Sequence, residues 1–170
     1  MSSHRIRSAL PLAALALGAC SSVVQPEYGI MGGVLYPCPA SFACVSSQES
    51  DPERKVEPLA YGSDRRDARS DLIGAINTFP GVRIVSSHRN YLRAEFPSKA
   101  LRNQDANEFY FAARAGVDDV EFYFPPSDRV IHVRSAARLG LIDGGENRDR
   151  VEALRRAFDQ LQKKRAQSPR

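Results

Sequence analysis

The stretch Val117–Ser135, VDDVEFYFPPSDRVIHVRS, decides the fold of this chain. Apolar and polar residues alternate on both sides of the turn residues Pro125–Asp128, which is the pattern of a β-hairpin with one buried face. We place Phe124 opposite Arg129 across this turn. The apolar face then pairs residues from the two strands, namely Phe122 with Ile131 and Val120 with Val133.

The other face of this hairpin carries charged residues. In the same register Glu121 meets His132 and Asp119 meets Arg134, and opposite charges across a strand pair agree with that register. Asp118 is the exception, because it points to the apolar side. A lone charge there is unfavourable by several kcal/mol, so we expect an arginine from residues 134–150 to pair with it.

The rest of the chain supplies two helices and further strands. The patterns predict a helix over 67–79, strands over 82–86 and 91–98, a loop over 99–107, a strand over 108–113 and a loop over 138–146. We expect Asn147 to be the N-cap of a second helix. The apolar face of this helix carries Val151, Leu154, Phe158 and Leu161. We therefore predict an α+β fold, with an antiparallel sheet of about four to five hairpin-connected strands and two helices packed on one face.

The first 20 residues have the layout of an export signal. Arg5 and Arg7 precede the apolar run Ala9–Ala19, which at 11 residues is shorter than the roughly 20 needed to span a bilayer. The run ends in Leu-Gly-Ala-Cys20, which resembles the lipobox of bacterial lipoproteins, where the cysteine is acylated and becomes the N-terminus. We expect residues 1–19 to be a signal peptide and Cys20 to carry lipid. A plain secretory signal and a buried helix are the alternatives.

Such an anchor has consequences for location and partners. Removing residues 1–19 takes away two of 24 basic residues and none of the 20 acidic ones, leaving a net charge of +2. This small excess argues against nucleic acid as a partner. The acyl chains attach the protein to a membrane without spanning it. Ser21 and Ser22 follow Cys20, and by resemblance to enteric lipoprotein sorting they favour the outer over the inner membrane. We predict an exported protein that faces the periplasm.

The predicted anchor also divides the chain. Residues 20–36 are expected to be a tether, residues 37–162 a single globular domain, and residues 163–170 a basic tail. Cys38 and Cys44 are six residues apart in an exported chain, where neighbouring thiols usually pair. We predict a structural disulfide, with free thiols or a metal or redox pair as alternatives. His88 and His132 are too sparse for us to predict a metal site.

Five runs carry a family resemblance: CP at 38–39 with CVSS at 44–47, YLRAEF at 91–96, GVDDVEF at 116–122, RSAARLG at 134–140, and Asp143 with NRDR at 147–150. In this order they resemble the motifs of a bacterial and plastid family, domain of unknown function 1499. Ala137 and Ile142 replace serines of its pattern, Val117 replaces an aromatic residue, and residues 99–115 resemble an insertion. The resemblance implies a domain over about residues 37–162, and it implies no activity.

The charged and polar residues of these motifs form the candidate site. They are Asp118, Asp119, Glu121, Arg134, Arg138, Asp143, Asn147, Arg148 and Arg150. Acids facing arginines across strands form structural ion-pair networks, which is the interpretation we favour. The same residues also suit a phosphate or carboxylate ligand, a divalent cation, or acid/base catalysis.

The functional prediction follows from these residues and from the N-terminus. Ser46 and Ser47 are interpreted as turn residues, and no nucleophile elbow is present in the sequence. We predict a lipid-anchored envelope protein without catalytic residues, metal or cofactor, which binds or scaffolds an envelope protein or an anionic small ligand. The alternatives are a hydrolase or metal-dependent enzyme built on Asp118, Asp119 and Glu121, and a binder of anionic ligands or lipid headgroups through Arg134, Arg138 and Arg148.

Overall fold

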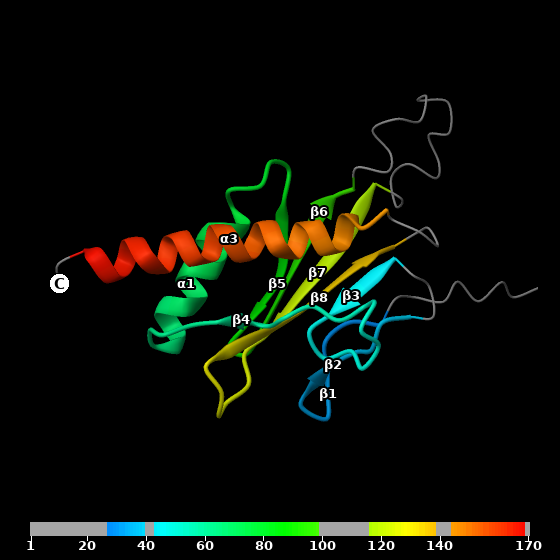
Figure 1. The fold of residues 1–170 in the computed structure, drawn as a ribbon, viewed down its shortest axis with the longest axis horizontal. Coiled ribbons are helices and arrows are strands. Elements are labelled where there is room, and N and C mark those ends of the chain that lie inside the picture. The colour runs from blue at the N-terminus through cyan, green and yellow to red at the C-terminus, as the bar shows by residue number, and fades with distance from the viewer. Residues whose placement is uncertain (1–26, 40–42, 99–115, 139–143, 169–170) are drawn as a thin grey trace, which may run out of the picture.

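An antiparallel sheet and two helices make up the fold in the computed structural model, which describes residues 27–39, 43–98, 116–138 and 144–168. The strands run in the order β3 (Cys44–Ser46), β8 (Val130–Ala137), β7 (Val117–Tyr123), β6 (Tyr91–Pro97) and β5 (Arg83–His88), and β4 (Leu59–Ala60) pairs with β8 as the sixth strand. Helices α1 (Arg65–Ile76) and α3 (Glu146–Gln167) cover one face of this sheet (Figure 1). The predicted α+β architecture is confirmed.

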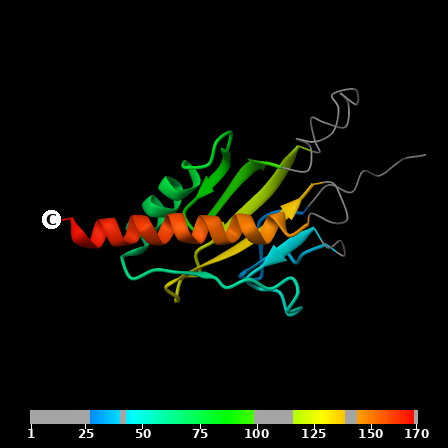
Figure 2. The ribbon, with the colours of Figure 1, turned by 45° about the horizontal axis from the view of Figure 1, so that its top comes forward.

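A hydrophobic core fills the space between the helices and the inner face of the sheet. Val151, Leu154 and Phe158 of α3 are fully buried there, at the spacing that the sequence predicts. Leu72 and Ile76 of α1 are fully buried beside them. Each such side chain stabilises the fold by roughly 1.5–3 kcal/mol. Figure 2 shows α3 running along the length of the sheet, so this one helix closes the core over most of the strands.

Helix α1 begins and ends earlier than the predicted range of 67–79. The side chain of Asp64 accepts a hydrogen bond from the backbone N–H of Asp67 at 2.8 Å, which places the N-cap before Arg65. The helix ends at Ile76, and Asn77 is its C-cap. Phe79 lies beyond the helix and still packs against the core.

The β7–β8 hairpin forms, but its predicted register is wrong by two residues. Phe122 pairs with Val133, and Glu121 pairs with Arg134. The backbone N–H of Phe124 donates to the carbonyl of Asn90, so Phe124 leaves the strand pair and lengthens the turn. A two-residue slip keeps every side chain on its predicted face, because the period of a strand is two. The slip changes only the partners across the pair.

The segment predicted as a tether contains a small hairpin. Strand β1 (Ile30–Met31) pairs with β2 (Val34–Leu35), and the N–H of Tyr36 donates to the carbonyl of Gly29. Residues 163–167, predicted to belong to a basic tail, continue helix α3. No helix in the described ranges is long and apolar enough to cross a membrane. The predictions for residues 1–26, 99–107 and 108–113 and for Asp143 concern residues outside the described ones.

Candidate functional site

The sheet separates the predicted polar residues into two clusters on opposite faces. Successive residues of a strand point to opposite sides, so Asp119 and Asp118 of β7 cannot share a site. The outer-face cluster lies on the side away from the helices and comprises Arg93, Glu95, Asp119, Glu121, Arg134 and Arg138. The inner-face cluster lies beneath α3 and comprises Asp118, Ser135, Glu146, Asn147 and Arg150.

Asp119 is the centre of the outer-face cluster. Its Oδ1 accepts hydrogen bonds from Arg93 at 2.7 Å and from Arg138 at 3.0 Å. Its Oδ2 accepts a second bond from Arg138 at 2.6 Å and one from the hydroxyl of Tyr28 at 2.7 Å. The guanidinium of Arg93 lies over the Tyr28 ring, 4.3 Å from its centroid. Each carboxylate oxygen therefore accepts two hydrogen bonds.

Glu121 is also surrounded by donors, and it is fully buried. Its Oε2 accepts a hydrogen bond from Arg134 at 2.5 Å. Its Oε1 accepts one from the hydroxyl of Tyr91 and one from the backbone N–H of Gly29, both at 2.7 Å. Tyr28 and Gly29 both come from the N-terminal segment, so this segment supplies donors to both buried acids of the outer face.

These contacts set the protonation states. Burial alone raises the pKa of Asp119, but the hydrogen bonds from Arg138 and Tyr28, together with the charges of Arg138 and Arg93, outweigh it and hold the pKa below its usual range. Burial and the bond to Asp119 raise the pKa of Tyr28 to about 12. Both groups are therefore fixed in one protonation state near neutral pH. A general acid or base instead has a pKa near the working pH.

The six residues of the outer-face cluster balance in charge, with three carboxylates and three guanidinium groups, and the exposed Arg83 adds a fourth guanidinium at its edge. Glu95 completes it by accepting from Arg138 and Arg83, both at 2.5 Å. One N–H is left over, because Nε of Arg134 is buried without a hydrogen-bond partner in the described structure. A phosphate or carboxylate ligand requires a fork of donors. The geometry supports a structural ion-pair network here.

The inner-face cluster confirms the expected partner for Asp118. Arg150 of α3 forms an ion pair with Asp118 and a second one with Glu146 at 3.0 Å. Its guanidinium also lies 5.7 Å from the centroid of the Phe96 ring. Arg150 donates further to Asn147 Oδ1 at 2.6 Å and to Ser135 Oγ at 3.0 Å. This cluster fastens the start of α3 to strands β7 and β8.

The prediction of Asn147 as an N-cap is wrong. Gly145 is the N-cap, in a left-handed conformation with φ of 89°, and Asn147 lies in the first turn of the helix. The side chain of Asn147 instead donates to the carbonyl of Ala43 at 3.1 Å and accepts from Ser135 at 2.6 Å. Because it is fully buried, its polar groups require these partners inside the protein.

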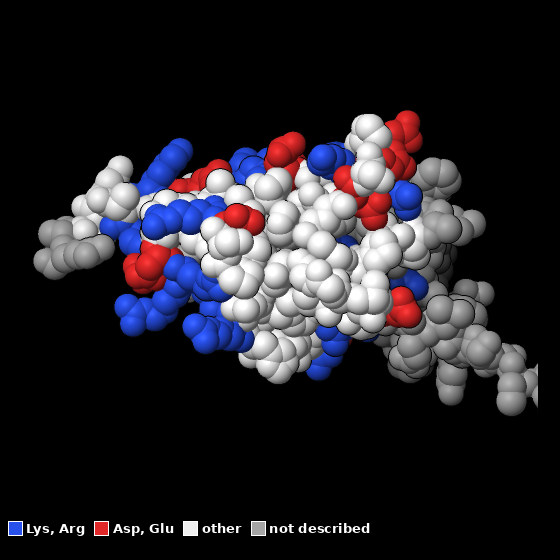
Figure 3. Space-filling view, turned by 90° about the horizontal axis from the view of Figure 1, so that it is seen from below, with Lys and Arg blue, Asp and Glu red and all other residues white. Residues whose placement is uncertain are grey.

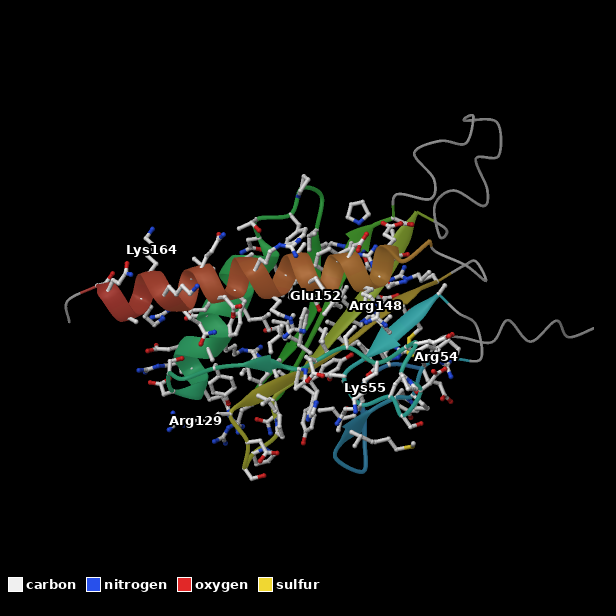
Figure 4. All side chains as sticks on the ribbon, in the orientation of Figure 1. Arg54, Lys55, Arg129, Arg148, Glu152 and Lys164 are labelled. Carbon is white, nitrogen blue, oxygen red and sulfur yellow. A yellow bond between two sulfur atoms is a disulfide. The ribbon has the colours of Figure 1, made fainter. Side chains whose placement is uncertain are left out.

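Arg148 lies outside both clusters. It donates to the backbone carbonyls of Lys55 at 2.8 Å and Glu53 at 2.7 Å. Figure 4 shows Arg148 on α3 beside Lys55 and the loop that follows β3. Arg155, two turns further along α3, donates to the carbonyl of Pro58 at 2.7 Å. These arginines hold the loop against the helix, so Arg148 does not contribute to a shared anion site with Arg134 and Arg138.

Ser47 and His132 form a contact that the sequence analysis missed. Ser47 Oγ lies 3.1 Å from His132 Nδ1 and accepts a hydrogen bond from the N–H of Val133 at 3.0 Å. Burial lowers the pKa of His132, against the opposing charge of Asp128. Among the hydrogen bonds of the described residues, none joins the other ring nitrogen to a carboxylate, which a catalytic triad requires. The contact extends the pairing of β3 with β8.

Cys38 and Cys44 form a disulfide, with their Cα atoms 5.7 Å apart. The predicted pairing is therefore confirmed. Cys44 is fully buried and pairs with Ala136 of β8. The disulfide ties the segment that follows the β1–β2 hairpin to the edge strand β3. Cys20 and its predicted lipid lie outside the described residues.

Two surface hollows lie beside the helices, away from the outer-face cluster. The larger one, about 930 Å³, lies between α1 and the end of α3, and Asp71, Asp159 and Arg165 line it. The smaller one, about 470 Å³, is lined by Phe79 and Phe96, with Arg150 and Arg156 also bordering it. In the described ranges, no group of three or more His, Cys, Asp or Glu side chains is arranged to hold a metal ion.

The comparisons with known proteins identify a family. A family model described as "Protein of unknown function (DUF1499)" matches residues 34–158. The chain belongs to this family. The match includes both clusters and excludes Tyr28 and Gly29, so the DUF1499 region begins within the β1–β2 hairpin. No curated protein and no solved structure matches the chain.

Proposed function

We propose that this DUF1499 protein is a lipid-anchored protein of the bacterial cell envelope. Its folded domain acts as a non-catalytic binding or scaffolding module. The proposed anchor rests on the N-terminal sequence, in which a basic start and a short apolar run lead to Leu-Gly-Ala-Cys20. The disulfide between Cys38 and Cys44 supports export, since disulfides persist in oxidising compartments.

One observation carries the non-catalytic role: the outer-face carboxylates are saturated by the protein itself. Asp119 and Glu121 accept hydrogen bonds from arginines, tyrosines and a backbone N–H, and both side chains are buried. A hydrolase built on these acids requires one of them to reach a substrate or a water molecule. The arginines likewise bind acids of their own chain, which argues against an anion site through Arg134 and Arg138.

The same contacts suggest how the domain is held at a membrane. Cys20 precedes Tyr28 by eight residues, and an extended chain of that length spans at most about 29 Å. Because Tyr28 bonds to Asp119, a lipid at Cys20 keeps the outer face of the sheet within that distance of the bilayer. The module is thereby placed close to the membrane surface, where it can meet membrane-associated partners.

The test is the mass of the N-terminal peptide. The full chain, expressed in a Gram-negative bacterium, is recovered from membranes and digested, and the peptide beginning at residue 20 is analysed. We expect cleavage before Cys20 and a mass increase that corresponds to acyl chains. The matched control is Cys20→Ser, which keeps both disulfide cysteines and should lose the acyl chains and the membrane fraction together. A wild-type peptide without acyl chains contradicts the proposal.

A further inference from the structure

The exposed apolar residues of the domain are concentrated on one hairpin. In the described structure the large hydrophobic side chains with high exposure are Ile30 at 38%, Met31 at 53% and Val34 at 43%. All three belong to β1 and β2, which pair Met31 with Val34 and Ile30 with Leu35. From Tyr28 to Pro37 the sequence contains no charged residue. Such an uncharged, apolar tip is a candidate interaction site.

The hairpin is held firmly at its base. Gly32 and Gly33 both have positive φ, at 61° and 85°, which suits a tight two-residue turn. Leu35 is buried, and its N–H donates to Gln48 at 2.9 Å. At the other strand, Gly29 donates to Glu121. The apolar tip is therefore presented in a fixed direction from the outer face of the sheet.

We infer that the tip of the β1–β2 hairpin inserts into the surface of the membrane that carries the anchor. This inference rests on the proposed lipid at Cys20, which precedes Ile30 by ten residues and so confines the tip to within about 36 Å of the lipid. Figure 3 views the side from which the hairpin projects, and a broad uncharged band crosses the middle of this face. The basic residues gather toward the end where α3 ends.

Lipid suits this tip better than a protein surface does. Ile30 shares one face of the hairpin with buried Leu35 and is still 38% exposed, whereas Met31 and Val34 lie on the opposite face. Exposed apolar groups therefore lie on both sides of the tip. A bilayer surrounds an inserted side chain, whereas a flat protein surface covers one face. Three side chains bind a bilayer weakly by themselves, but an anchor nearby raises their effective concentration.

The experiment uses the absence of tryptophan from the chain. Met31→Trp, in the full acylated chain, makes the tip the single source of tryptophan emission. Lys164→Trp is the matched control, since Lys164 is exposed and lies near the far end of α3 (Figure 4). Both variants are reconstituted in phosphatidylethanolamine and phosphatidylglycerol vesicles, with or without brominated acyl chains. A third variant adds Ile30→Ser and Val34→Ser to Met31→Trp.

We expect brominated lipid to quench roughly half of the emission at position 31 and little at position 164. The two serines should reduce the quenching at position 31. Equal quenching at both positions, or none at position 31, overturns the inference. A blue shift at position 31 that grows with protein concentration in detergent indicates a second copy, and contact with another protein instead of lipid leaves position 31 unquenched in vesicles. Both outcomes contradict the insertion of the tip into lipid.

The peptide mass separates this test from that of the anchor. If the chain is acylated but position 31 is not quenched, the proposed anchor stands and the inferred insertion of the hairpin tip is wrong. A chain without acyl groups overturns the proposed function. Whether the hairpin tip inserts into lipid is then tested by adding the same variants to an excess of vesicles. Quenching at position 31 in that mixture supports insertion of the tip, and the absence of quenching contradicts it.

Discussion

The hydroxyl of Tyr28 donates a 2.7 Å hydrogen bond to Oδ2 of Asp119, joining residues 91 positions apart. The neighbouring Gly29 donates its N–H to Glu121, two residues further along the same strand. The N-terminal segment thus contacts both buried acids of the outer face. The Tyr28–Asp119 and Gly29–Glu121 hydrogen bonds hold the segment that leads to the proposed anchor against the outer face of the sheet.

Removing this hydroxyl should weaken the fold. A hydrogen bond to a charged group contributes about 1.5–3 kcal/mol, so we expect Tyr28→Phe to lose about that much. The pKa of Tyr28 is raised from 10.0 to about 12, so the unfolded chain ionises first and the contribution fades as the pH rises through that interval. Urea unfolding of wild type and variant at a series of pH values tests both points. A difference that persists above pH 12 contradicts the account.

The inner-face ion pair should show strong coupling. Arg150→Met removes the arginine that pairs with buried Asp118, and we expect a loss of about 3–5 kcal/mol in the free energy of unfolding. The double variant Asp118→Asn and Arg150→Met should lose less than the sum of the single losses. Arg156→Met, at an exposed position on the same helix, is the control and should change little. Additive losses indicate that the pair is not coupled.

His132 should make stability fall in mild acid. Burial lowers its pKa from the ordinary 6.5, so below that pH the unfolded state binds more protons than the folded state. Stability then decreases as the pH falls through 6.5 toward the lowered pKa. His132→Gln should remove this slope while keeping a polar group near Ser47. If wild type and variant show the same dependence between pH 7 and 5, the interpretation is wrong.

The disulfide should stabilise the edge of the sheet. Cys38 and Cys44 are six residues apart, and closing a loop of this size contributes about 2 kcal/mol in the chain-entropy estimate. We expect a reductant, or Cys38→Ser with Cys44→Ser, to lower the melting temperature by several degrees. The serine variant should no longer respond to the reductant. A reductant effect of equal size on that variant excludes the disulfide as its cause.

The sequence predicts the elements well because their periods are local. Phe158 and Val151 lie on the predicted face of α3, and Asp118 has an arginine partner from the expected range. The predicted β7–β8 register is wrong because a slip of two residues preserves the faces, and the bond from Phe124 to Asn90, which takes Phe124 out of the pair, is not visible in the alternation. Gly32-Gly33 between two apolar pairs is a hairpin signal that the composition of the tether obscured.

The division of the candidate site follows a different rule. Alternation along β7 already places Asp118 and Asp119 on opposite faces, so the sequence contains that separation. The contact of Tyr28 with Asp119 depends on where the chain returns after the disulfide, which no local pattern reports. The same holds for Ser47 and His132, which meet because β3 pairs with β8.

Amide hydrogen exchange at Gly29 tests most directly whether the N-terminal segment is bound to the buried acids of the outer face. In the wild-type chain, measured by nuclear magnetic resonance, we predict that the Gly29 amide exchanges roughly 10- to 100-fold more slowly than in an unstructured peptide, because it donates to Glu121. Tyr28→Phe should accelerate this exchange. A Gly29 amide that exchanges at the unstructured rate in the wild-type protein would contradict the account.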